Sequence, residues 1–485
     1  MIEYVALPNQ TGGGRGPDRP DSRSPTVDIN VLKFGGSCVA SAAALSAVAS
    51  LVERSVRRRD TIVVVSALGG VTDRLVAAAG ASSHVESESI VAELRSRHLD
   101  VLDGLGPSAS ERAAYTRHLD KMLDGLRCQL ELHAIGGSAD IRDGILAVGE
   151  RLAAPLVALA CSLAGSPARP VDASSVLVTD DRFGSARPDE RASEDALLRR
   201  VYMDGVFAGA VPVITGFIGR TRDGRTTTLG RNGSDLTAAV VASIVQAKQL
   251  VYYKDVDGIL QADPGLVDDP GVVPRLSFDE ASDLASVGVQ PIHPLALGSL
   301  RDGTTAVEFR NAFNPEHPGT AIARDDAGAP ASIKTVVAAG DVRLVSFELG
   351  REPSHGARPT FGRALSTATR IDPSIVTIGG GGADAAATFL TRASCADAIV
   401  DALVRDASSG VRCFQAPRDV VAAAIVGDGV WRDSGVAARA LSALGGRGRF
   451  VHSMTRSPNA CALRFVVEGL TAKEAAEALY PLTAA

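Results

Sequence analysis

Two short apolar segments, each followed within two residues by a pair of glycines, constrain the fold of this chain more than any other feature. Residues 28–34 (DINVLKF) and 61–67 (TIVVVSA) have the length of β-strands, and a helix is predicted between them. Continuous apolar strands that alternate with helices are typical of a parallel sheet that is buried on both faces. Similar segments at 211–218 and 250–253 extend the pattern. We therefore predict an α/β fold around a mostly parallel sheet.

The chain is long enough for more than one domain. Its 485 residues exceed one ordinary domain, so two or three are expected. Residues 1–27 are rich in Gly, Pro, Arg and Asp and are predicted to form a disordered tail. The α/β domain should then span 28–325. Two units of similar size follow at 333–410 and 411–485, and their weak duplication predicts a pair of small α+β modules of the βαββαβ type.

Composition argues against several classes of protein. The net charge of −6 and the pI of about 5.8 do not favour binding to nucleic acid or to an anionic membrane. Six cysteines without a CxxC pair indicate reduced thiols in a cytoplasmic protein, and no zinc site. No apolar run reaches about 18 residues and no signal-peptide core is present, so we expect neither a membrane span nor export.

The stretch TTTLGRNGSDLTAAV places a cation, two glycines and a carboxylate at the start of a predicted helix. Gly230 and Gly233 allow a sharp turn and close approach of the backbone to a ligand. Ser234 or Asp235 can cap the helix, whose first N–H groups attract an anion. Arg231 adds a bidentate partner for a carboxylate or phosphate. The same residues also fit an ordinary capped junction with a solvated arginine, and this segment alone does not decide between the two.

Candidate site residues gather where the predicted strands end. Lys33 and Ser66 end the first two strands, Phe217 ends a later one, and Glu150 lies on a helix. Ligands of open parallel sheets bind outside the carboxyl ends of the strands, so these residues and the junction 231–235 can share one crevice. A lysine, helix N-termini and an arginine suit the transfer of a phosphoryl group. No GxxxxGK[ST] or GxGxxG motif is present, and a surface lysine at a strand end is the alternative interpretation of Lys33.

A series of longer motifs occurs in one particular order along the chain. They are LKFGGSCVAS, VVVSALGGVTD, VGERLAAPLVA, DDRFGSARPD, ITGFIGRT, TTTLGRNGSDLTAA, KDVDGILQADP and LASVGVQPIHPLAL. Over residues 29–325 the chain therefore resembles the aspartate kinase family of the amino-acid kinase superfamily. The resemblance implies a three-layer αβα amino-acid kinase domain with a mostly parallel sheet, followed by two α+β ACT-like domains.

The resemblance also implies roles for individual residues. Lys33 is similar to the lysine that contacts the transferred phosphate, and Asp235 to the acid that holds this lysine in place. Arg231 would bind the α-carboxylate of aspartate and Glu150 its α-ammonium group. The implied aspartate pocket consists of Ser66, Thr72, Glu150, Phe217, Arg231 and Ser234. The implied nucleotide side consists of Lys33, Gly35, Gly36, Ser37, Thr228, Lys254, Asp255, Leu260, Asp263 and Gln290.

The reaction that the resemblance implies is phosphate transfer from ATP to L-aspartate, giving 4-phospho-L-aspartate and ADP, with Mg²⁺ bridging the phosphates. In the family this is the first step of aspartate-family amino-acid biosynthesis, which supplies lysine and threonine. ACT domains of the family bind lysine, threonine or related effectors and form the dimer. A lysine or threonine effector and a homodimer or larger homo-oligomer are therefore implied.

The sequence departs from the family pattern at three places. Gly265 and Gln290 stand where many members carry an arginine and a lysine on the phosphate side, and residues 374–390 replace a polar effector-binding strand. Residues 453–467 in the second unit are closer to the pattern. Two alternatives to an aspartate kinase stay open: a kinase for an aspartate analogue in a specialised pathway, and a non-catalytic protein that senses an amino acid.

Overall fold

The computed structural model describes most of the chain beyond the predicted tail. The described residues are 28–484 except 82, 204–207, 287–292, 302, 325–331, 350–357, 372–375, 381–385, 406–410, 415–417 and 447. The tail predicted at 1–27 and the candidate residue Gln290 lie outside these ranges.

An eight-stranded sheet forms the centre of the N-terminal domain, in the order β3-β4-β2-β1-β7-β9-β10-β8. Its strands are β1 (Ile29–Phe34), β2 (Asp60–Val65), β3 (Ala168–Val171), β4 (Val211–Thr215), β7 (Gln249–Lys254), β8 (Arg275–Ser277), β9 (Ala306–Asn311) and β10 (Thr320–Ala323). Neighbouring strands run parallel except β9 and β10. Strands β1 and β2 are buried along almost their whole length because both of their faces are covered. The predicted mostly parallel sheet is confirmed.

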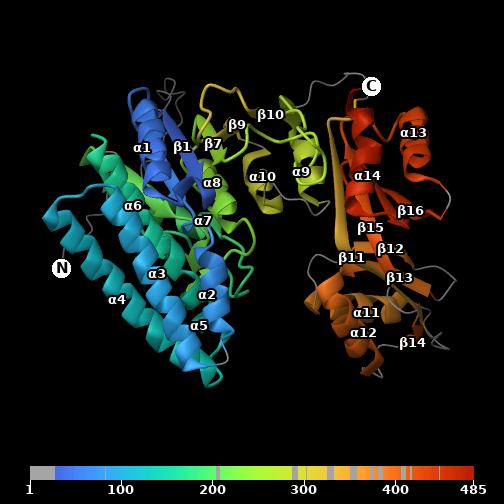
Figure 1. Ribbon diagram of the computed structural model, residues 1–485, viewed down its shortest axis with the longest axis horizontal. Helices are drawn as coiled ribbons and strands as arrows, with labels where there is room; N and C mark the ends of the chain where they lie inside the picture. Colours follow the sequence, from blue (N-terminus) through green and yellow to red (C-terminus); the bar gives the residue numbers. More distant parts are fainter. Residues whose placement is uncertain are drawn as a thin grey trace, which may run out of the picture.

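Helices cover both faces of this sheet, as Figure 1 shows for the blue-to-yellow part of the chain. One face carries α1 (Ala42–Val56) and α6 (Val148–Leu163), with α2 (Val71–Ala79), α3 (His84–Gly104), α4 (Ala109–Ala134) and α5 (Ala139–Leu146) packed outside them. The other face carries α7 (Glu190–Met203), α8 (Gly233–Ile244), α9 (Phe278–Ser286) and α10 (Pro294–Arg301). This arrangement confirms the predicted three-layer αβα domain.

One helical stretch of the described residues is long and apolar enough to cross a membrane. It is Ala139–Leu163, which comprises α5 and α6, and 83% of its apolar window is buried inside the protein. Helix α6 packs against α1 and against strands β3 and β4, so its apolar composition is explained by its place in the core.

The predicted strand at 211–218 is wrong in its second half. Strand β4 ends at Thr215, and Phe217 takes a positive φ of 69°, which ends the extended conformation. The chain then forms a separate two-stranded sheet from β5 (Ile218–Arg220) and β6 (Thr226–Thr228). Phe217 therefore lies in a tight turn between two sheets, where the sequence indicated a strand end.

The C-terminal part contains two α+β modules that share one seven-stranded sheet. The first consists of β11 (Thr335–Leu349), α11 (Arg358–Ile371), β12 (Val376–Gly380), β13 (Ala386–Arg392), α12 (Ala393–Arg405) and β14 (Val411–Phe414). The second consists of β15 (Arg418–Val426), α13 (Ser434–Leu444), β16 (Phe450–Arg456), β17 (Ala462–Glu468) and α14 (Ala472–Leu479). The first follows the predicted βαββαβ order, whereas the second is βαββα, because no strand follows α14 among the described residues.

Strand β11 links the two modules because it belongs to both. Its N-terminal half pairs with β15 of the second module, and its C-terminal half pairs with β13 and β14 of the first. Figure 1 shows this long strand running beside β15 between the upper red and the lower orange parts. Residues 335–339 therefore lie at the edge of the second module, although in sequence they precede the first.

Two buried carboxylates on α9 join the N-terminal domain to the second module. Glu280 accepts hydrogen bonds from Lys334 Nζ at 2.6 Å and from the backbone N–H of Asp428 at 2.7 Å. Asp283 accepts from the Ser457 hydroxyl, from the Asn459 side chain at 3.1 Å and from the Cys461 N–H at 2.9 Å. Buried carboxylates are tolerated where several donors satisfy them, so these two helix positions fix the second module against the domain.

Candidate active site

Lys33 points from strand β1 toward the helix layer that contains α8. Side chains alternate along a strand, and Lys33 lies on the same face as Val31, which packs with the α8 residues. Its Nζ is 2.6 Å from Asp235 Oδ1, and both residues are buried. The sequence predicted this neighbourhood, and the interpretation of Lys33 as a solvated surface lysine is wrong.

Asp235 lies in the first turn of α8 and holds two cations. Besides Lys33, it accepts a hydrogen bond from Lys254 Nζ at 3.3 Å. Burial by itself would raise the pKa of the Asp235 carboxyl, but the two ammonium groups outweigh burial and lower this pKa below its usual range. The carboxylate therefore remains ionised and keeps two ammonium groups at the carboxyl ends of β1 and β7.

The predicted cap of α8 at Ser234 or Asp235 is wrong by two to three residues. The helix begins at Gly233, and its N-cap is Asn232 in the left-handed conformation, with φ of 56° and no side-chain cap. Asp235 cannot serve as the cap because its carboxylate already binds the two lysines. The first turn of α8 thus carries Asp235 as the anionic partner of lysines on β1 and β7. The N-terminus of the helix is formed by the left-handed backbone turn at Asn232.

Two glycine turns cross closely above β1 and β2. A Cβ on Gly36 would lie 3.1 Å from the carbonyl oxygen of Ala67 and 3.3 Å from the Cα of Gly69. The N–H of Gly69 donates to the carbonyl of Gly36 at 2.9 Å. This close approach favours glycine, and it brings the turn of Gly35, Gly36 and Ser37 beside the turn after Ser66. Ser37 is exposed at the start of a short 3-10 helix, Ser37–Val39.

Glu150, in the first turn of α6, is almost fully buried beside Ser66. One of its oxygens accepts the N–H of Ala67 at 3.1 Å, while Oε2 is buried and has no hydrogen-bond partner among the described residues. Burial raises the pKa of this carboxyl to about 8, an effect that the Ala67 N–H and the charge of Lys33 only partly offset. A buried acceptor without a donor is costly, so this oxygen is suited to receive a donor from a ligand.

The junction around Phe217 and Ser234 is tightly packed. A Cβ on Gly233 would lie 2.8 Å from a ring carbon of Phe217, and one on Gly216 would lie 2.5 Å from the Cβ of Ser234. The Phe217 N–H donates to the Thr237 hydroxyl at 3.0 Å, which ties this turn to α8. The β4–β5 turn and the start of α8 therefore form one rigid unit.

Thr72 and Arg231 are more open than the rest of the predicted aspartate pocket. Thr72 is half-buried at the start of α2, and Arg231 is exposed one residue before the N-cap of α8. Arg231 forms no ion pair with any residue that the structure describes. Its guanidinium is accordingly available to a ligand anion.

The predicted nucleotide residues divide into two groups. Lys254 belongs to the Asp235 cluster, and Asp255, next to it, is exposed. The carbonyl of Leu260, in contrast, accepts the Thr335 hydroxyl of strand β11 at 2.9 Å, and exposed Asp263 closes a turn by accepting the Gly265 N–H at 2.8 Å. The segment from 259 to 272 thus packs against the second module as well as bordering the N-terminal domain.

Comparison with known proteins places this domain in a family. A model of the amino acid kinase family matches residues 28–311, which is more than half of the chain. The chain belongs to the amino acid kinase family.

Curated relatives in this family are similar over the amino acid kinase domain. Aspartokinase 1 (chloroplastic) of Arabidopsis thaliana is 36% identical over 304 residues, covering 61% of this chain and 52% of the relative. Lysine-sensitive aspartokinase 3 of Escherichia coli (strain K12) is 30% identical over 307 residues, covering 62% of this chain and 66% of that protein. The chain spans between 52% and 61% of the length of the three Arabidopsis aspartokinases that it matches.

Solved structures show that the fold likeness extends through the C-terminal modules. E. coli aspartokinase III in complex with aspartate and ADP, in the R-state, superposes with a TM-score of 0.82 at 22% identity and covers 94% of this chain and all of its own. The same enzyme with lysine and aspartate, in the T-state, gives a TM-score of 0.71 over 94% of this chain. The amino acid kinase fold followed by two ACT-type modules is therefore confirmed.

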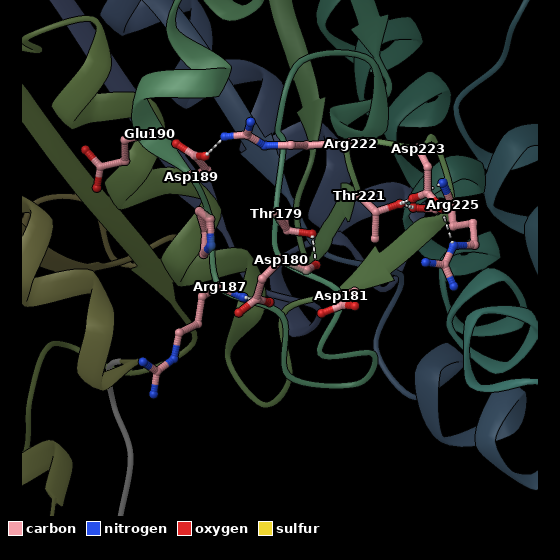
Figure 2. A pocket seen from close by; sticks show the side chains of 11 residues that line it. Thr179, Asp180, Asp181, Arg187, Asp189, Glu190, Thr221, Arg222, Asp223 and Arg225 are labelled. Carbon is pink, nitrogen blue, oxygen red and sulfur yellow. Dashed lines mark hydrogen bonds and ion pairs between the residues drawn. The ribbon is translucent and has the colours of Figure 1, made fainter.

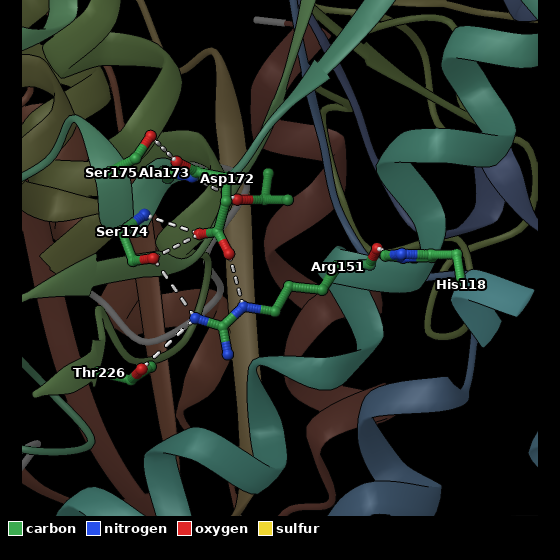
Figure 3. Close-up of polar contacts among 8 residues, drawn as sticks. His118, Arg151, Asp172, Ala173, Ser174, Ser175 and Thr226 are labelled. Atoms are coloured by element: carbon green, nitrogen blue, oxygen red, sulfur yellow. Dashed lines mark hydrogen bonds and ion pairs between the residues drawn. The ribbon is translucent and has the colours of Figure 1, made fainter. Parts of the chain in front are cut away.

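Two polar residues near the site were missed by sequence analysis. Asp143 on α5 accepts from the backbone N–H and the hydroxyl of Thr228, so Thr228, predicted on the nucleotide side, gives its hydroxyl to a buried carboxylate. Arg151, next to Glu150, donates to Asp172 at 2.7 Å and contacts the Thr226 hydroxyl at 3.4 Å (Figure 3). A lone aspartate in a helix carries no sequence signal, whereas Arg151 follows Glu150 directly within the motif VGERLAAPLVA.

An open hollow of about 730 Å³ lies on the surface of the amino acid kinase domain beside the loop that follows β5 (Figure 2). It is lined by Thr179, Asp180, Asp181, Arg187, Pro188, Asp189, Glu190, Thr221, Arg222, Asp223 and Arg225. Figure 2 shows that its charged groups pair with one another, for example Arg222 with Asp189 at 2.8 Å and Arg225 with Asp223 at 2.9 Å. Internal pairing of this kind is typical of a solvated surface, and we assign no ligand to it.

Proposed function

We propose that this protein is an aspartate kinase, which transfers the γ-phosphoryl group of ATP to the side-chain carboxylate of L-aspartate. The observation that carries the proposal is the pairing of two features at the carboxyl ends of the strands. Buried Asp235 holds the ammonium groups of Lys33 and Lys254, and the unpartnered oxygen of Glu150 lies in the same region. A cationic pair suits a phosphate chain, and a buried carboxylate suits a substrate ammonium.

Each group has a distinct task in the proposed reaction. Lys33 and Lys254 neutralise charge on the phosphates, and Asp235 keeps both lysines in position. Arg231 binds the α-carboxylate of aspartate, and Glu150 binds its α-ammonium group. An oxygen of the aspartate side chain attacks the γ-phosphorus, the bond from this phosphorus to the β,γ-bridging oxygen breaks, and ADP leaves with that oxygen. The products are 4-phospho-L-aspartate and ADP.

Mg²⁺ fits this site as a companion of the nucleotide. Among the described residues no group of three or more His, Cys, Asp or Glu side chains could hold a metal ion. Magnesium in phosphoryl-transfer sites is bound largely by substrate phosphates and water, with one or two carboxylates, so a dedicated cage is not needed. Exposed Asp255, beside Lys254, is the carboxylate that we propose to approach it. The ion would reduce the negative charge on the phosphates.

The relatives support the substrate, and they also suggest regulation. The names of the curated relatives include aspartokinase, and the R-state structure was solved with aspartate and ADP. One relative is named lysine-sensitive, and the T-state structure contains lysine. We therefore propose an amino-acid effector, lysine or threonine, for the two ACT-type modules, and assembly into a homodimer or larger homo-oligomer through them.

A coupled assay of ADP formation with several acids tests the proposal. We expect aspartate to give the highest kcat/KM in a panel with glutamate, asparagine, N-acetylaspartate and succinate. N-acetylaspartate and succinate lack the free α-ammonium group that Glu150 would bind. Arg231→Ala should raise the KM for aspartate at least tenfold, whereas Arg222→Ala, which removes an exposed arginine of the surface hollow, should not. An acid other than aspartate with the highest kcat/KM, or no acid-dependent ADP formation, would contradict the proposal.

A further inference from the structure

Asp143 is a buried carboxylate whose oxygens hold two separate loops. It lies on α5 and is 1% exposed. Oδ2 accepts the backbone N–H of Gly184 at 2.8 Å and that of Thr228 at 2.7 Å, and Oδ1 accepts the Thr228 hydroxyl at 3.0 Å. Three donors from two chain segments that are 44 residues apart in sequence therefore converge on one side chain.

These contacts place the turn that carries Arg231. Thr228 is the last residue of β6 and precedes Arg231 by three positions. The N–H of Ala186 donates to the Thr228 carbonyl at 2.9 Å, so the loop around Gly184 runs along the same strand. Gly230 has a φ of +79°, and a Cβ there would lie 3.2 Å from the Gly184 carbonyl oxygen. The loop that Asp143 holds thus packs directly against the turn before Arg231.

Strand β6 depends on such side-chain ties because it is short and stands apart from the main sheet. It has three residues and pairs with β5 alone. At its start, the Thr226 hydroxyl accepts from Arg151, whose guanidinium also binds Asp172, as Figure 3 shows. At its end, Asp143 binds Thr228. A two-stranded ribbon is marginally stable by itself, so these ties hold the strand in one position.

The chemistry of Asp143 indicates that its role is positional. Its burial is unfavourable to the ionised form and raises the pKa of the carboxyl above its usual range. No lysine or arginine among the described residues forms an ion pair with it. Burial of a carboxylate costs folding free energy, and a protein with a well-packed apolar residue in its place is often at least as stable. An apolar side chain at position 143, however, could not accept hydrogen bonds from the two backbone N–H groups. The benefit of an aspartate here is the fixed geometry of the two loops.

We propose that Asp143 is a positioning residue of the aspartate pocket, which acts through Thr228 to fix the turn that presents Arg231 to the substrate α-carboxylate. This inference rests on the proposed function. It moves Thr228 from the nucleotide side, where sequence analysis put it, to the support of the aspartate side. It also places the supports of Arg231 and Glu150 on consecutive helices, α5 and α6.

Steady-state kinetics of four variants in the full chain test this role. Asp143→Asn keeps the size of the side chain but replaces one acceptor oxygen with a donor NH₂ group, and it should raise the KM for aspartate tenfold or more. The KM for ATP and the affinity for ADP should stay within about twofold, because Arg231 contacts aspartate and not the nucleotide.

Thr228→Val removes one of the three hydrogen bonds to Asp143 and should cause a smaller rise in the KM for aspartate. Thr228→Ser restores the hydroxyl and should behave like the wild type. Asp140→Asn removes an equal charge from the first turn of α5 and is the matched control.

The outcomes separate this inference from the proposed function. Wild-type protein without aspartate-dependent ADP formation contradicts the function itself. An active wild type with an unchanged aspartate KM in Asp143→Asn contradicts the inference alone. A rise in the KM for ATP in Thr228→Val would return Thr228 to the nucleotide side and also overturn the inference. If Asp143→Asn does not fold, as judged by circular dichroism, the comparison of Thr228→Val with Thr228→Ser decides.

Discussion

Lys33 Nζ and Asp235 Oδ1 are 2.6 Å apart, and the two side chains are 5% and 1% exposed. Removal of a buried charge from water is costly, and this pair persists because Lys254 adds a second cation to the same carboxylate. The arrangement joins β1, β7 and the first turn of α8 at one point. The ammonium groups of Lys33 and Lys254 share Asp235 as their anionic partner. Both lie at the edge of the sheet where a phosphate chain would bind.

Lys33→Met should remove most of the activity. Loss of a positioned cation at a transferring phosphoryl group costs on the order of 10³-fold in kcat. The free energy of unfolding should also fall, by about 1–3 kcal/mol, because Asp235 then keeps only the longer contact with Lys254. ADP-formation kinetics and urea unfolding measure the two effects, and Lys121→Met on the exposed surface of α4 is the control. Turnover within tenfold of the wild type would show that Lys33 does not contact the transferred group.

Glu150→Gln should weaken aspartate binding and yet stabilise the protein at alkaline pH. The pKa of the Glu150 carboxyl rises from its ordinary value of 4.5 to about 8 on burial. Between these values the folded protein holds a proton that the unfolded chain has lost, so the contribution of Glu150 to stability falls as pH rises from 4.5 to 8. Glutamine does not ionise, and its stability advantage over glutamate should grow by about 2–4 kcal/mol between pH 5 and pH 8. Chemical unfolding of the variant and the wild type at both pH values measures the difference between their free energies of unfolding. The same difference at pH 5 and at pH 8 would contradict a buried Glu150 that is protonated at neutral pH.

Binding of aspartate at neutral pH should release a proton. At pH 7 the empty site holds Glu150 mostly protonated, because the pKa of this carboxyl is about 8. A bound ammonium group favours the ionised form and lowers this pKa. Calorimetry of aspartate binding in buffers with different ionisation enthalpies should therefore show a release of about 0.5–0.9 protons at pH 7. Proton uptake, or the same observed enthalpy in all buffers, would contradict the assignment of Glu150 to the ammonium group.

Asp283→Ala should loosen the contact between the domain and the second module. Asp283 is 1% exposed, and its loss leaves the N–H groups of Asn459 and Cys461 without their acceptor, at a cost of about 2–5 kcal/mol. Cys461 is 6% exposed, and burial raises the pKa of its thiol to about 12, which suppresses its reactivity. We expect the variant to react faster at Cys461 with a thiol reagent, as located by mass spectrometry. Asp279→Asn on the same helix breaks an ion pair with Arg301 at the surface and should change the rate much less than Asp283→Ala, because Asp279 accepts no hydrogen bond from residues 457–461.

Local sequence signals predicted the central parts of the fold and of the site. The apolar segment at 28–34 and its glycine pair correspond to β1 and the turn after it, because burial on both faces demands an uninterrupted apolar strand. Lys33 was found for the same reason, since a lysine within such a segment stands out. The shared strand β11 could not be predicted, because its N-terminal half pairs with β15, where the partner of Thr335 is Val426, 91 residues away in sequence.

The errors arise where tertiary contacts override local preferences. Phe217 was predicted to end a strand, but packing against Gly233 places it in a left-handed turn. Gly379 and Gly380 are residues that disfavour strands, and they nevertheless pair with β13 in strand β12. The hydrogen bond from the Thr228 hydroxyl to Asp143, 85 residues away, likewise had no local sequence signal, and the nucleotide-side assignment of Thr228 stays a prediction. Each case depends on a partner that is distant in sequence.

Trapping of the product with hydroxylamine is the most direct test of the central claim, that a side-chain carboxylate accepts the phosphoryl group. An acyl phosphate reacts with hydroxylamine to give a hydroxamate and inorganic phosphate, whereas a phosphate ester does not. With ATP, Mg²⁺ and aspartate, the account predicts aspartate β-hydroxamate in an amount equal to the ADP formed, and none with the Lys33→Met variant. ADP formed from ATP and aspartate without any hydroxamate would contradict it.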